Sequence, residues 1–487
     1  MNLLRTKTIE QSIEDTEEPE HQLKKSLGAL DLTVFGVGVI IGTGIFVLTG
    51  VAAHDKAGPS VALSFVVAGI VCGLAALCYA ELSSTVPVAG SAYTFSYATL
   101  GELVAWIIGW DLVLELALGA SVVAVGWSQY LNSLLEQIGL ALPTSIAGET
   151  ATVNIPAMLI VIVLTGVAIA GIRLSAMVTN VIVMIKVAIV LLVIVAGLFF
   201  IRAANYSPYV PPAEPSQQTG GLKAPLIELI FGSAPSTYGV AGIFTAAAVV
   251  FFAFIGFDIV ATAAEETKNP QRDMPRGILG SLVICTLLYV AVSTVVTGMQ
   301  KYSELDIAAP LSAAFKAVNQ PVIATLINIG ALAGLTSVML ILLLGQSRIF
   351  FAMSRDHMLP PNFAKVHPKF GTPYRISLAT GLIVTLLAGF IPLTALAELV
   401  NIGTLFAFIV VSLGVVILRR TRPDLQRPFR TPLVPLVPIL AVLACLYLML
   451  NLPAETWLRF AVWLALGFII FFAYSRPHSR LEGADTR

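Results

Sequence analysis

The stretch GVGVIIGTGIF at residues 36–46 and the stretch VVFFAFIGFD at residues 249–258 decide the fold, because each places glycine in the middle of a long apolar run. In the first stretch, Gly42, Thr43 and Gly44 follow one another directly. Glycine is a poor helix former, and a helix unwinds at membrane depth only where it is buried in protein or lines a wet cavity. The two stretches therefore predict a pair of broken membrane helices.

Unwinding frees backbone groups that bind charged ligands. The half-helix that resumes after a break starts with free N–H groups and the positive end of its dipole, which suits a carboxylate. The half-helix that stops leaves free carbonyl groups, which suit an ammonium. Paired broken helices, five spans apart, are typical of inverted-repeat transporters and here indicate a site for a zwitterion. The alternative is that these glycines only let helices pack closely, as small residues do in lipid.

The composition makes lipid the solvent for much of the surface. Hydrophobic residues are 57% of the 487-residue chain. Charged residues are only 11%, whereas soluble domains carry about 25%. The formal net charge is zero, which argues against a nucleic-acid partner. We therefore expect an all-α membrane protein.

Apolar runs long enough to cross a bilayer recur along the whole chain. A helix needs about 20 apolar residues to cross the hydrocarbon core. We predict twelve spans, near residues 30–54, 58–82, 100–130, 155–173, 176–201, 240–267, 277–300, 324–353, 376–395, 397–418, 433–452 and 457–474. The separation of the ninth span from the tenth rests on the turn IPLTAL around Pro392, where a re-entrant hairpin is the alternative.

Lysine and arginine residues predict which side of the membrane each loop faces. With the N-terminus in the cytoplasm, the tail and the even-numbered loops hold 21 of the 28 Lys and Arg residues, and the opposite side holds 6. Cytoplasmic loops are enriched in these residues, so we expect both termini in the cytoplasm and the protein in the plasma membrane. The polar N-terminal tail has no short apolar segment followed by a cleavage site, so we expect it to be retained.

Ionisable residues inside the predicted spans are costly and mark candidate functional positions. Lys186 lies in the middle of the fifth span, too deep for easy snorkelling, and is a candidate proton carrier or a fixed cation in place of a metal ion. The alternative is a permanent ion pair with an acid. Asp111 and Glu115 are four residues apart and share one face of the third span. Glu115 lies deeper and is the better candidate partner for Lys186 or a substrate amine, whereas Asp111 is a candidate contact with a neighbouring helix.

Other acids lie nearer the ends of the spans. Glu398 is near the outer start of the tenth span, where a solvated role is the alternative. Glu81, Glu265 and Glu266 lie near cytoplasmic ends, and we expect them to bond loop amides or basic loops. The histidines lie outside the spans except His54, which is the last residue of the first span; the cysteines lack metal-ligand spacing, and no P-loop or G-x-S-x-G motif occurs. We therefore expect no enzyme, no nucleotide-driven pump and no bound metal.

Six segments, in this order, resemble the cationic amino acid transporter family of the amino acid–polyamine–organocation superfamily. They are GVGVIIGTGIF, CYAELSSTVPVAGSAYTFSYATLGEL, FFAFIGFD, EETKNPQRDMPRGI, GQSRIFFAMSRDHMLP and ELVNIGTLFAF. The likeness runs from about residue 26 to residue 475 and is closest to twelve-span bacterial members, which are proton-coupled.

The resemblance implies the five-plus-five inverted repeat of the LeuT type, with helices 1 and 6 broken and two further helices added. The expected segments are an N-terminal tail at 1–29, a first repeat at 30–201, an extracellular loop at 202–239, a second repeat at 240–418, the last two helices at 433–474 and a C-terminal tail at 475–487.

The resemblance also implies a substrate site. It would place the substrate carboxylate at Thr43 and Gly44, and Phe252 would act as a gate over the site. The α-ammonium would lie near backbone carbonyls of four residues: Ile40, Phe252, Ala253 and Ile255. Lys186 matches the lysine that stands in for a sodium ion in proton-coupled members, and Glu115 matches an acidic position in bacterial relatives. The proton is then the coupling ion, and no cofactor is expected.

Two features depart from that family. The loop 202–239 is longer than in close bacterial relatives, so its role is open. The side-chain pocket expected around Phe252, Ser337, Val338 and Leu342 is apolar, which fits a small neutral amino acid better than a guanidinium. The family name therefore does not fix the substrate as cationic.

We expect proton-coupled uptake of an amino acid by alternating access, either neutral, such as alanine, or cationic, such as arginine or lysine. One alternative is an exchanger of amino acids or polyamines with the same fold, and another is a non-transporting amino acid sensor. The expected partners are the amino acid and the lipid bilayer. The sequence leaves open whether a small membrane protein or a sterol binds the lipid-facing helices.

Overall fold

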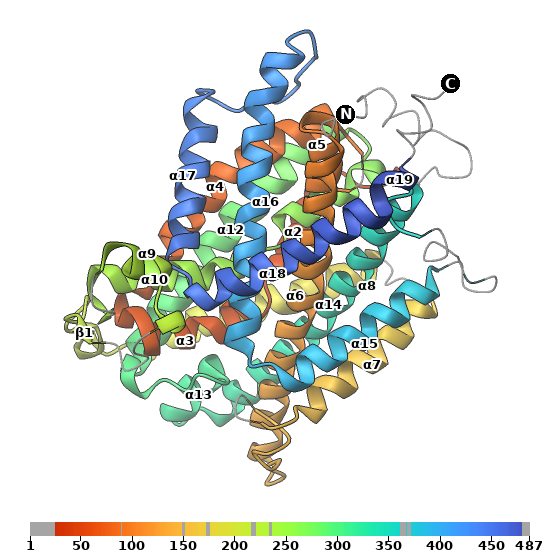
Figure 1. Ribbon diagram of the computed structural model, residues 1–487. Coiled ribbons are helices and arrows are strands. Elements are labelled where there is room, and N and C mark those ends of the chain that lie inside the picture. The colour runs from red at the N-terminus through yellow and green to blue at the C-terminus, as the bar shows by residue number, and fades with distance from the viewer. Residues whose placement is uncertain are drawn as a thin grey trace.

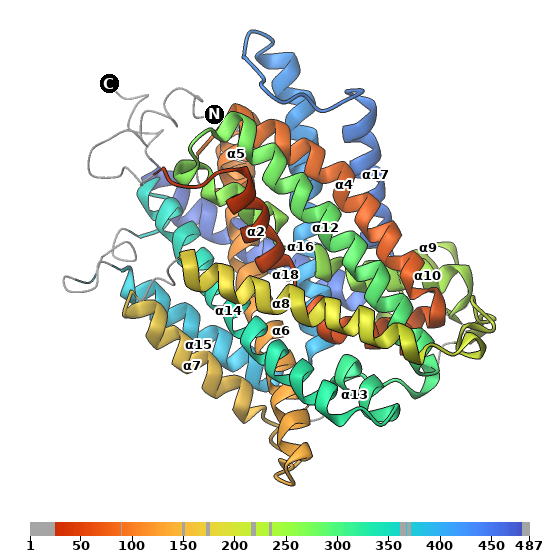
Figure 2. The ribbon, with the colours of Figure 1, turned by 180° about the vertical axis from the view of Figure 1, so that it is seen from behind.

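The computed structural model describes residues 25–88, 90–148, 151–171, 176–215, 221–232, 236–360, 367 and 372–479 of the chain. The predicted tail segments 1–24 and 480–487, with parts of the predicted external and basic loops, lie outside the described residues. The described chain is a bundle of helices with a single two-stranded sheet at its edge (Figures 1 and 2). The predicted all-α class is confirmed.

The membrane-crossing helices match the predicted spans in number and order. In the described chain, eight helical segments are long and apolar enough to cross a membrane, and one of them, Gly44–Thr85, holds the second half of the first crossing and the whole second crossing. Four shorter apolar helices supply the first half of the first crossing and the fourth, ninth and eleventh crossings, which gives twelve crossings. The unbroken ones are α4 (Val61–Thr85), α6 (Glu102–Gln137), α7 (Ile155–Ile169), α8 (Ala176–Gly197), α12 (Pro270–Met299), α14 (Pro321–Arg355), α15 (Tyr374–Phe390), α16 (Leu393–Thr421), α17 (Leu436–Leu450) and α18 (Ala454–Ile470). Since α15 and α16 are separate helices on either side of Pro392, the prediction of two spans there is confirmed.

Proline and asparagine mark where several helices begin. A proline occupies the first turn of α7, α12 and α14 and of the short helix α13 (Pro310–Ala317). The missing N–H is not needed there, and the fixed φ suits a helix start. At α7, the Asn154 side chain also accepts a hydrogen bond from the Ala157 N–H at 3.2 Å. These residues account for where the crossing helices start.

The first crossing is broken at the predicted glycines. It consists of α2 (Ala29–Ile40), a π-helical turn at Gly44–Leu48, α3 (Thr49–Ala52) and a second π-helical turn at Ala53–Ala57. Ile41 and Gly42 between α2 and the first turn are not helical. The carbonyl of Val37 accepts a bond from the Ile41 N–H at 3.0 Å, and the carbonyls that follow it in α2 are left without a helical donor.

The sixth crossing is broken in the same way. It consists of α10 (Gly239–Val250), a 3-10 turn at Phe251–Phe254, α11 (Phe257–Val260) and a 3-10 segment at Ala261–Glu266. Between the halves, Gly256 has φ of 125°, a backbone conformation that side chains disfavour. The Asp258 carboxylate accepts a hydrogen bond from the Gly256 N–H at 3.1 Å, just before the second half begins.

The order of elements repeats after five crossings. The short helix α5 (Ala92–Thr99) joins the second crossing to the third, and α13 joins the seventh to the eighth, which is the equivalent place. The third crossing α6 packs along the eighth, α14, and the fourth, α7, packs along the ninth, α15. This arrangement agrees with the predicted inverted repeat, whereas the repeat boundaries at 30–201 and 240–418 stay a prediction.

The loop between the fifth and sixth crossings carries the sheet. Strand β1 (Glu214–Pro215) pairs antiparallel with β2 (Ser236–Thr237), and helix α9 (Leu226–Phe231) lies between them in sequence. Figure 1 shows this loop gathered at one edge of the bundle, beside α10.

The last crossing is attached to the third by tryptophans. The rings of Trp110 on α6 and Trp463 on α18 stack with their centroids 4.3 Å apart. Each indole N–H donates to the backbone carbonyl of the other residue, at 3.0 and 3.2 Å. Helix α18, followed by a π-helical turn and α19 (Arg476–His478), is therefore tied to the helix that carries Glu115.

Candidate functional site

A small cavity lies where the two helix breaks meet. Its free volume of about 30 Å³ holds about two water molecules. The first crossing supplies Val39, Ile40, Gly42, Thr43 and Gly44; α6 supplies Glu115, Leu116, Gly119 and Val123; the sixth crossing supplies Phe252 and Ile255; and α14 supplies Val338 and Leu342. Four crossings that are distant in sequence therefore share one cavity.

Seven of the nine residues predicted for the substrate site line this cavity, namely Ile40, Thr43, Gly44, Glu115, Phe252, Ile255 and Leu342. Ala253 does not line it, because it packs directly behind Gly44, where a Cβ atom would overlap the Ala253 backbone. Ser337 does not line it either, and its hydroxyl donates to the Gly334 carbonyl at 2.8 Å. The binding roles of all nine residues stay predictions.

The polar side of the cavity is formed by the first break. The Thr43 side chain is fully buried, and within the described chain its hydroxyl has no hydrogen-bond partner. Its other face rests on α6, where a Cβ atom at Gly126 would lie 2.8 Å from Thr43 Cγ2. Buried hydroxyls are normally paired, so this hydroxyl and the N–H groups after the break are available to an anionic group in the cavity.

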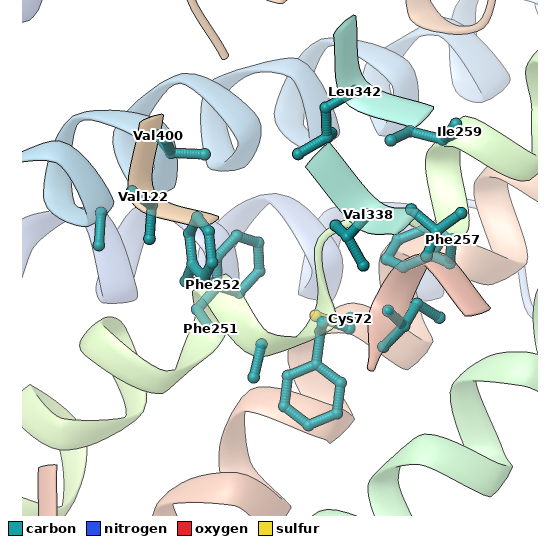
Figure 3. Packing of buried hydrophobic residues seen from close by; sticks show 14 of the residues in the cluster. Cys72, Val122, Phe251, Phe252, Phe257, Ile259, Val338, Leu342 and Val400 are labelled. Carbon is teal, nitrogen blue, oxygen red and sulfur yellow. The ribbon is translucent and has the colours of Figure 1, made fainter. Parts of the chain in front are cut away.

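The remaining walls are mostly apolar. Val338 and Leu342 lie one turn apart on α14, and Figure 3 shows them near the sixth-crossing segment that carries Phe252. Leu116 and Val123 close the cavity from α6. Leu116, Gly119 and Val123 were not predicted, although Gly119 and Val123 follow Glu115 at intervals of four residues. That helical spacing from Glu115 would have indicated Gly119 and Val123, but not Leu116, which directly follows Glu115.

Glu115 is buried among acids and not beside Lys186. Its carboxylate oxygens have no hydrogen-bond partner in the described part of the chain. The carboxyls of Asp258 and Asp111 are close enough to act electrostatically on this carboxylate. Asp111 itself rests on α16, where a Cβ atom at Gly403 would lie 2.5 Å from its Oδ1 atom. Asp111 therefore packs against the neighbouring helix, but neither of its carboxylate oxygens has a hydrogen-bond partner in the described chain.

The amine of Lys186 binds a carbonyl that the first break sets free. The side chain is fully buried, and Nζ donates to the Gly38 carbonyl at 2.5 Å. Its stem packs on α14, where a Cβ atom at Gly334 would lie 3.0 Å from Lys186 Cγ. No described carboxylate forms an ion pair with this amine, so the predicted pairing of Lys186 with Glu115 is wrong. Lys186 joins α8 to α2 and α14, whereas Glu115 lines the cavity from α6.

Sequence reasoning missed Tyr289. This buried residue of α12 places its hydroxyl 2.7 Å from the Ile40 carbonyl and 2.9 Å from the Ala253 carbonyl. A single side chain thus contacts both helix breaks. A tyrosine deep in an apolar span, away from the interfaces where tyrosine is enriched, would have indicated it, because a buried phenolic hydroxyl needs a partner.

Two of the peripheral acids bond to elements at the ends of the crossings. Glu81 on α4 accepts two hydrogen bonds from Arg419, at 2.9 and 2.7 Å, and one from the Thr431 N–H at 2.7 Å. The prediction that Glu81 bonds loop amides or basic loops is confirmed by the Thr431 N–H, whereas Arg419 lies in the last turn of α16. Glu398 accepts a hydrogen bond from the Thr456 hydroxyl at 3.2 Å and so joins α16 to α18.

Comparison with known proteins finds a matching family model and relatives that are named as transporters or permeases. A family model described as amino acid permease matches residues 27–474. Two relatives come from Bacillus subtilis (strain 168). A methylthioribose transporter is 45% identical over 94% of this chain and 95% of its own length. The branched-chain amino acid permease BcaP is 46% identical over 99% of both chains.

A plant relative and a solved structure extend the comparison. Cationic amino acid transporter 2, vacuolar, of Arabidopsis thaliana is 41% identical over 83% of this chain and 61% of its own length. The solved structure of MhsT in complex with L-phenylalanine covers 92% of this chain and 100% of that chain, with a TM-score of 0.57 and 14% identity. This last likeness concerns the fold alone, and it confirms the predicted LeuT-type architecture.

Proposed function

The chain belongs to the amino acid permease family, and on that premise we propose that it moves a neutral amino acid with an apolar side chain across the membrane together with a proton. Amino acid transport by an integral membrane protein follows from the family and its members, which are transporters and not enzymes. The resemblance to the cationic amino acid transporters is confirmed at the level of the family. The class of substrate and the coupling ion are the proposal.

The cavity between the two breaks is the observation that carries the proposal. The unpaired Thr43 hydroxyl and the N–H groups near Gly44 suit a carboxylate. Carbonyls of the breaks, with the Glu115 carboxylate opposite, suit an α-ammonium. A zwitterion held in this way directs its side chain at Val338 and Leu342, which favour an aliphatic group.

The name of one relative agrees with a substrate that has an aliphatic side chain. BcaP is named for branched-chain amino acids and matches nearly the whole chain. The plant relative is named for cationic amino acids. Within the lining, Glu115 is the one charged side chain, and in the proposal it is engaged by the substrate ammonium. A guanidinium would then face apolar walls at the far end of the cavity, which is unfavourable.

Lys186 is the proposed proton carrier. Its amine holds the Gly38 carbonyl of α2, one turn before the first break. A charged donor binds a carbonyl more strongly than a neutral one does, so gain or loss of a proton changes how firmly α8 holds α2. Movement of the two broken helices around a fixed site is the usual basis of alternating access in this fold.

We also propose that both termini are cytoplasmic and that the protein lies in the plasma membrane. Twelve crossings are an even number, so both ends emerge on the same side. The loops on that side hold most of the Lys and Arg residues. Labelling of cysteines introduced at Lys25 and at His478, in intact and in permeabilised cells, tests this orientation.

Uptake into proteoliposomes tests the transport proposal. Labelled leucine, alanine and arginine are supplied with and without an inward proton gradient. We expect gradient-driven accumulation of leucine and alanine in excess of arginine. Preferential accumulation of arginine would contradict the proposed substrate class. Movement that needs preloaded amino acid and ignores the gradient would contradict proton coupling.

A further inference from the structure

The loop between the fifth and sixth crossings turns an apolar surface outward. Helix α9 exposes Leu229, Ile230 and Phe231, and Phe231 is 77% exposed. Leu222, just before the helix, is also exposed. The one charged residue of α9, Glu228, is buried against the protein instead. A helix that faces water shows the opposite pattern, with its polar residues outward.

The bonds of this segment fix its height relative to the membrane. The Leu226 N–H donates to the Leu452 carbonyl at 3.0 Å, and the Ala454 N–H donates to the Ala224 carbonyl at 3.0 Å. Residues 451–453 form the turn between α17 and α18, and a turn between two crossing helices lies at the membrane surface. The start of α9 is therefore at the level of the headgroups.

Neighbouring residues also indicate that the start of α9 lies at the level of the lipid headgroups. Trp457, in the first turn of α18, donates from its indole to the Met449 carbonyl at 2.9 Å, and tryptophan is enriched at membrane interfaces. Leu446 on α17 and Leu458 on α18, on either side of the same turn, are exposed on helices that cross the bilayer. The apolar surface of α9 thus adjoins a surface that lipid covers. Figure 1 shows α9 at the edge of the bundle, not over its centre.

We propose that α9 lies in the headgroup region of the bilayer and inserts its C-terminal end, with Leu229, Ile230 and Phe231, toward the acyl chains, so that the partner of this loop is a lipid surface. Short amphipathic helices bind membranes in this way, with the apolar face at the boundary between headgroups and acyl chains. A contiguous apolar surface is otherwise rare on the water-exposed part of a protein.

The same loop holds the outer half of the first broken crossing. The Tyr238 N–H donates to the Lys56 carbonyl at 2.9 Å, and its hydroxyl donates to the His54 carbonyl at 2.6 Å. Burial, with Tyr302 and Asp55 nearby, raises the pKa of Tyr238 to about 12, so the hydroxyl keeps its proton at physiological pH. Tyr238 therefore ties this loop to the half-helix that begins at Gly44. This role is independent of which amino acid is carried.

Site-directed fluorescence tests the proposal. The native cysteines are all buried, so a cysteine introduced at Phe231 reacts selectively with an environment-sensitive label. A cysteine at Glu214, an exposed charged residue of β1 in the same loop, is the matched control. In proteoliposomes containing nitroxide-labelled lipids, we expect blue-shifted emission and lipid quenching at 231 and neither at 214.

Two results would overturn the proposal. Quenching of the label at 231 by aqueous iodide, as strong as at 214 and without lipid quenching, would place α9 in water. Protection from both quenchers would mean that a protein covers the patch, either a second copy or a small membrane protein. A label at Leu229 repeats the measurement independently, so poor folding of one variant does not leave the question open.

Discussion

The hydroxyl of Tyr289 lies 2.7 Å from the carbonyl oxygen of Ile40, the last residue of α2 before the first break. The same hydroxyl lies 2.9 Å from the Ala253 carbonyl in the sixth crossing. Because a tyrosine hydroxyl has one proton, it donates to one of these carbonyls at a time. Helix α12 therefore connects the two breaks through a hydroxyl that is able to alternate between them.

Replacing Tyr289 with Phe should destabilise the protein, because it leaves buried carbonyls without a donor. We expect a loss of about 1–3 kcal/mol in the free energy of unfolding, measured by denaturant titration in detergent. Tyr79→Phe is the matched control, since the Tyr79 hydroxyl is buried but has no partner in the described chain. Equal effects of the two substitutions would contradict the role of the Tyr289 hydrogen bonds.

Replacing Lys186 with Met should abolish proton-driven uptake while the protein still folds. The substitution keeps the length of the side chain, removes the proton-binding group, and leaves the Gly38 carbonyl unpaired at a cost of about 1–3 kcal/mol. Uptake with and without a proton gradient is the measurement. Lys316→Met, which removes an amine bonded to Ser133 near the C-terminal end of α6, is the control. Undiminished gradient-driven uptake would exclude Lys186 as the proton carrier.

Replacing Thr43 with Val should weaken substrate binding without destabilising the protein, because the hydroxyl has no partner in the described chain. We expect an affinity about tenfold lower, equivalent to about 1.4 kcal/mol. Thermal shift with leucine and alanine measures this. Thr49→Val is the control, because the Thr49 hydroxyl bonds only the Ile45 carbonyl of its own helix and Thr49 does not line the cavity. An unchanged affinity in the Thr43 variant would count against this carboxylate site.

Replacing Leu342 with Ala should enlarge the apolar end of the cavity and shift selectivity toward larger side chains. We expect the ratio of phenylalanine to valine uptake to rise roughly tenfold, within the usual range for a hydrophobic pocket. Leu343→Ala is the control: Leu343 is buried but does not line the cavity, so this variant should lose stability and keep its selectivity. A selectivity shift as large in the Leu343 variant would argue against a side-chain pocket at Leu342.

Replacing Glu81 with Gln should cost about 2–3 kcal/mol of stability, because it leaves Arg419 without its charge partner. The cost is below that of a fully buried pair, since the Arg419 side chain is 26% exposed and also bonds the Thr431 carbonyl. Glu266→Gln is the control. Its contact with Arg348 is long, at 3.6 Å, and the Arg348 side chain is 59% exposed, so we expect a change within about 0.5 kcal/mol.

Hydropathy and the positions of glycine were sufficient to predict the arrangement of the crossings along the chain. The number of crossings, the separation at Pro392 and the break after Ile40 all depend on residues that are neighbours in sequence. Insertion in lipid and unwinding at glycine are local events, so a local pattern predicts them well. The same reasoning placed Lys186 and Glu115 inside the membrane, where both are buried.

The sequence by itself determined how deep each residue lies along its crossing. Only the tertiary structure decided which residue of a neighbouring helix it contacts. Lys186 and Glu115 are both deep, yet the lysine on α8 reaches the Gly38 carbonyl, while the glutamate on α6 lines the cavity between the breaks. Ala253 lies behind Gly44 and Tyr289 lies between the breaks for the same reason. Rotation and distance between helices depend on the packing of residues far apart in sequence, and glycines such as Gly38 and Gly44 set that packing only once the facing helix is in place.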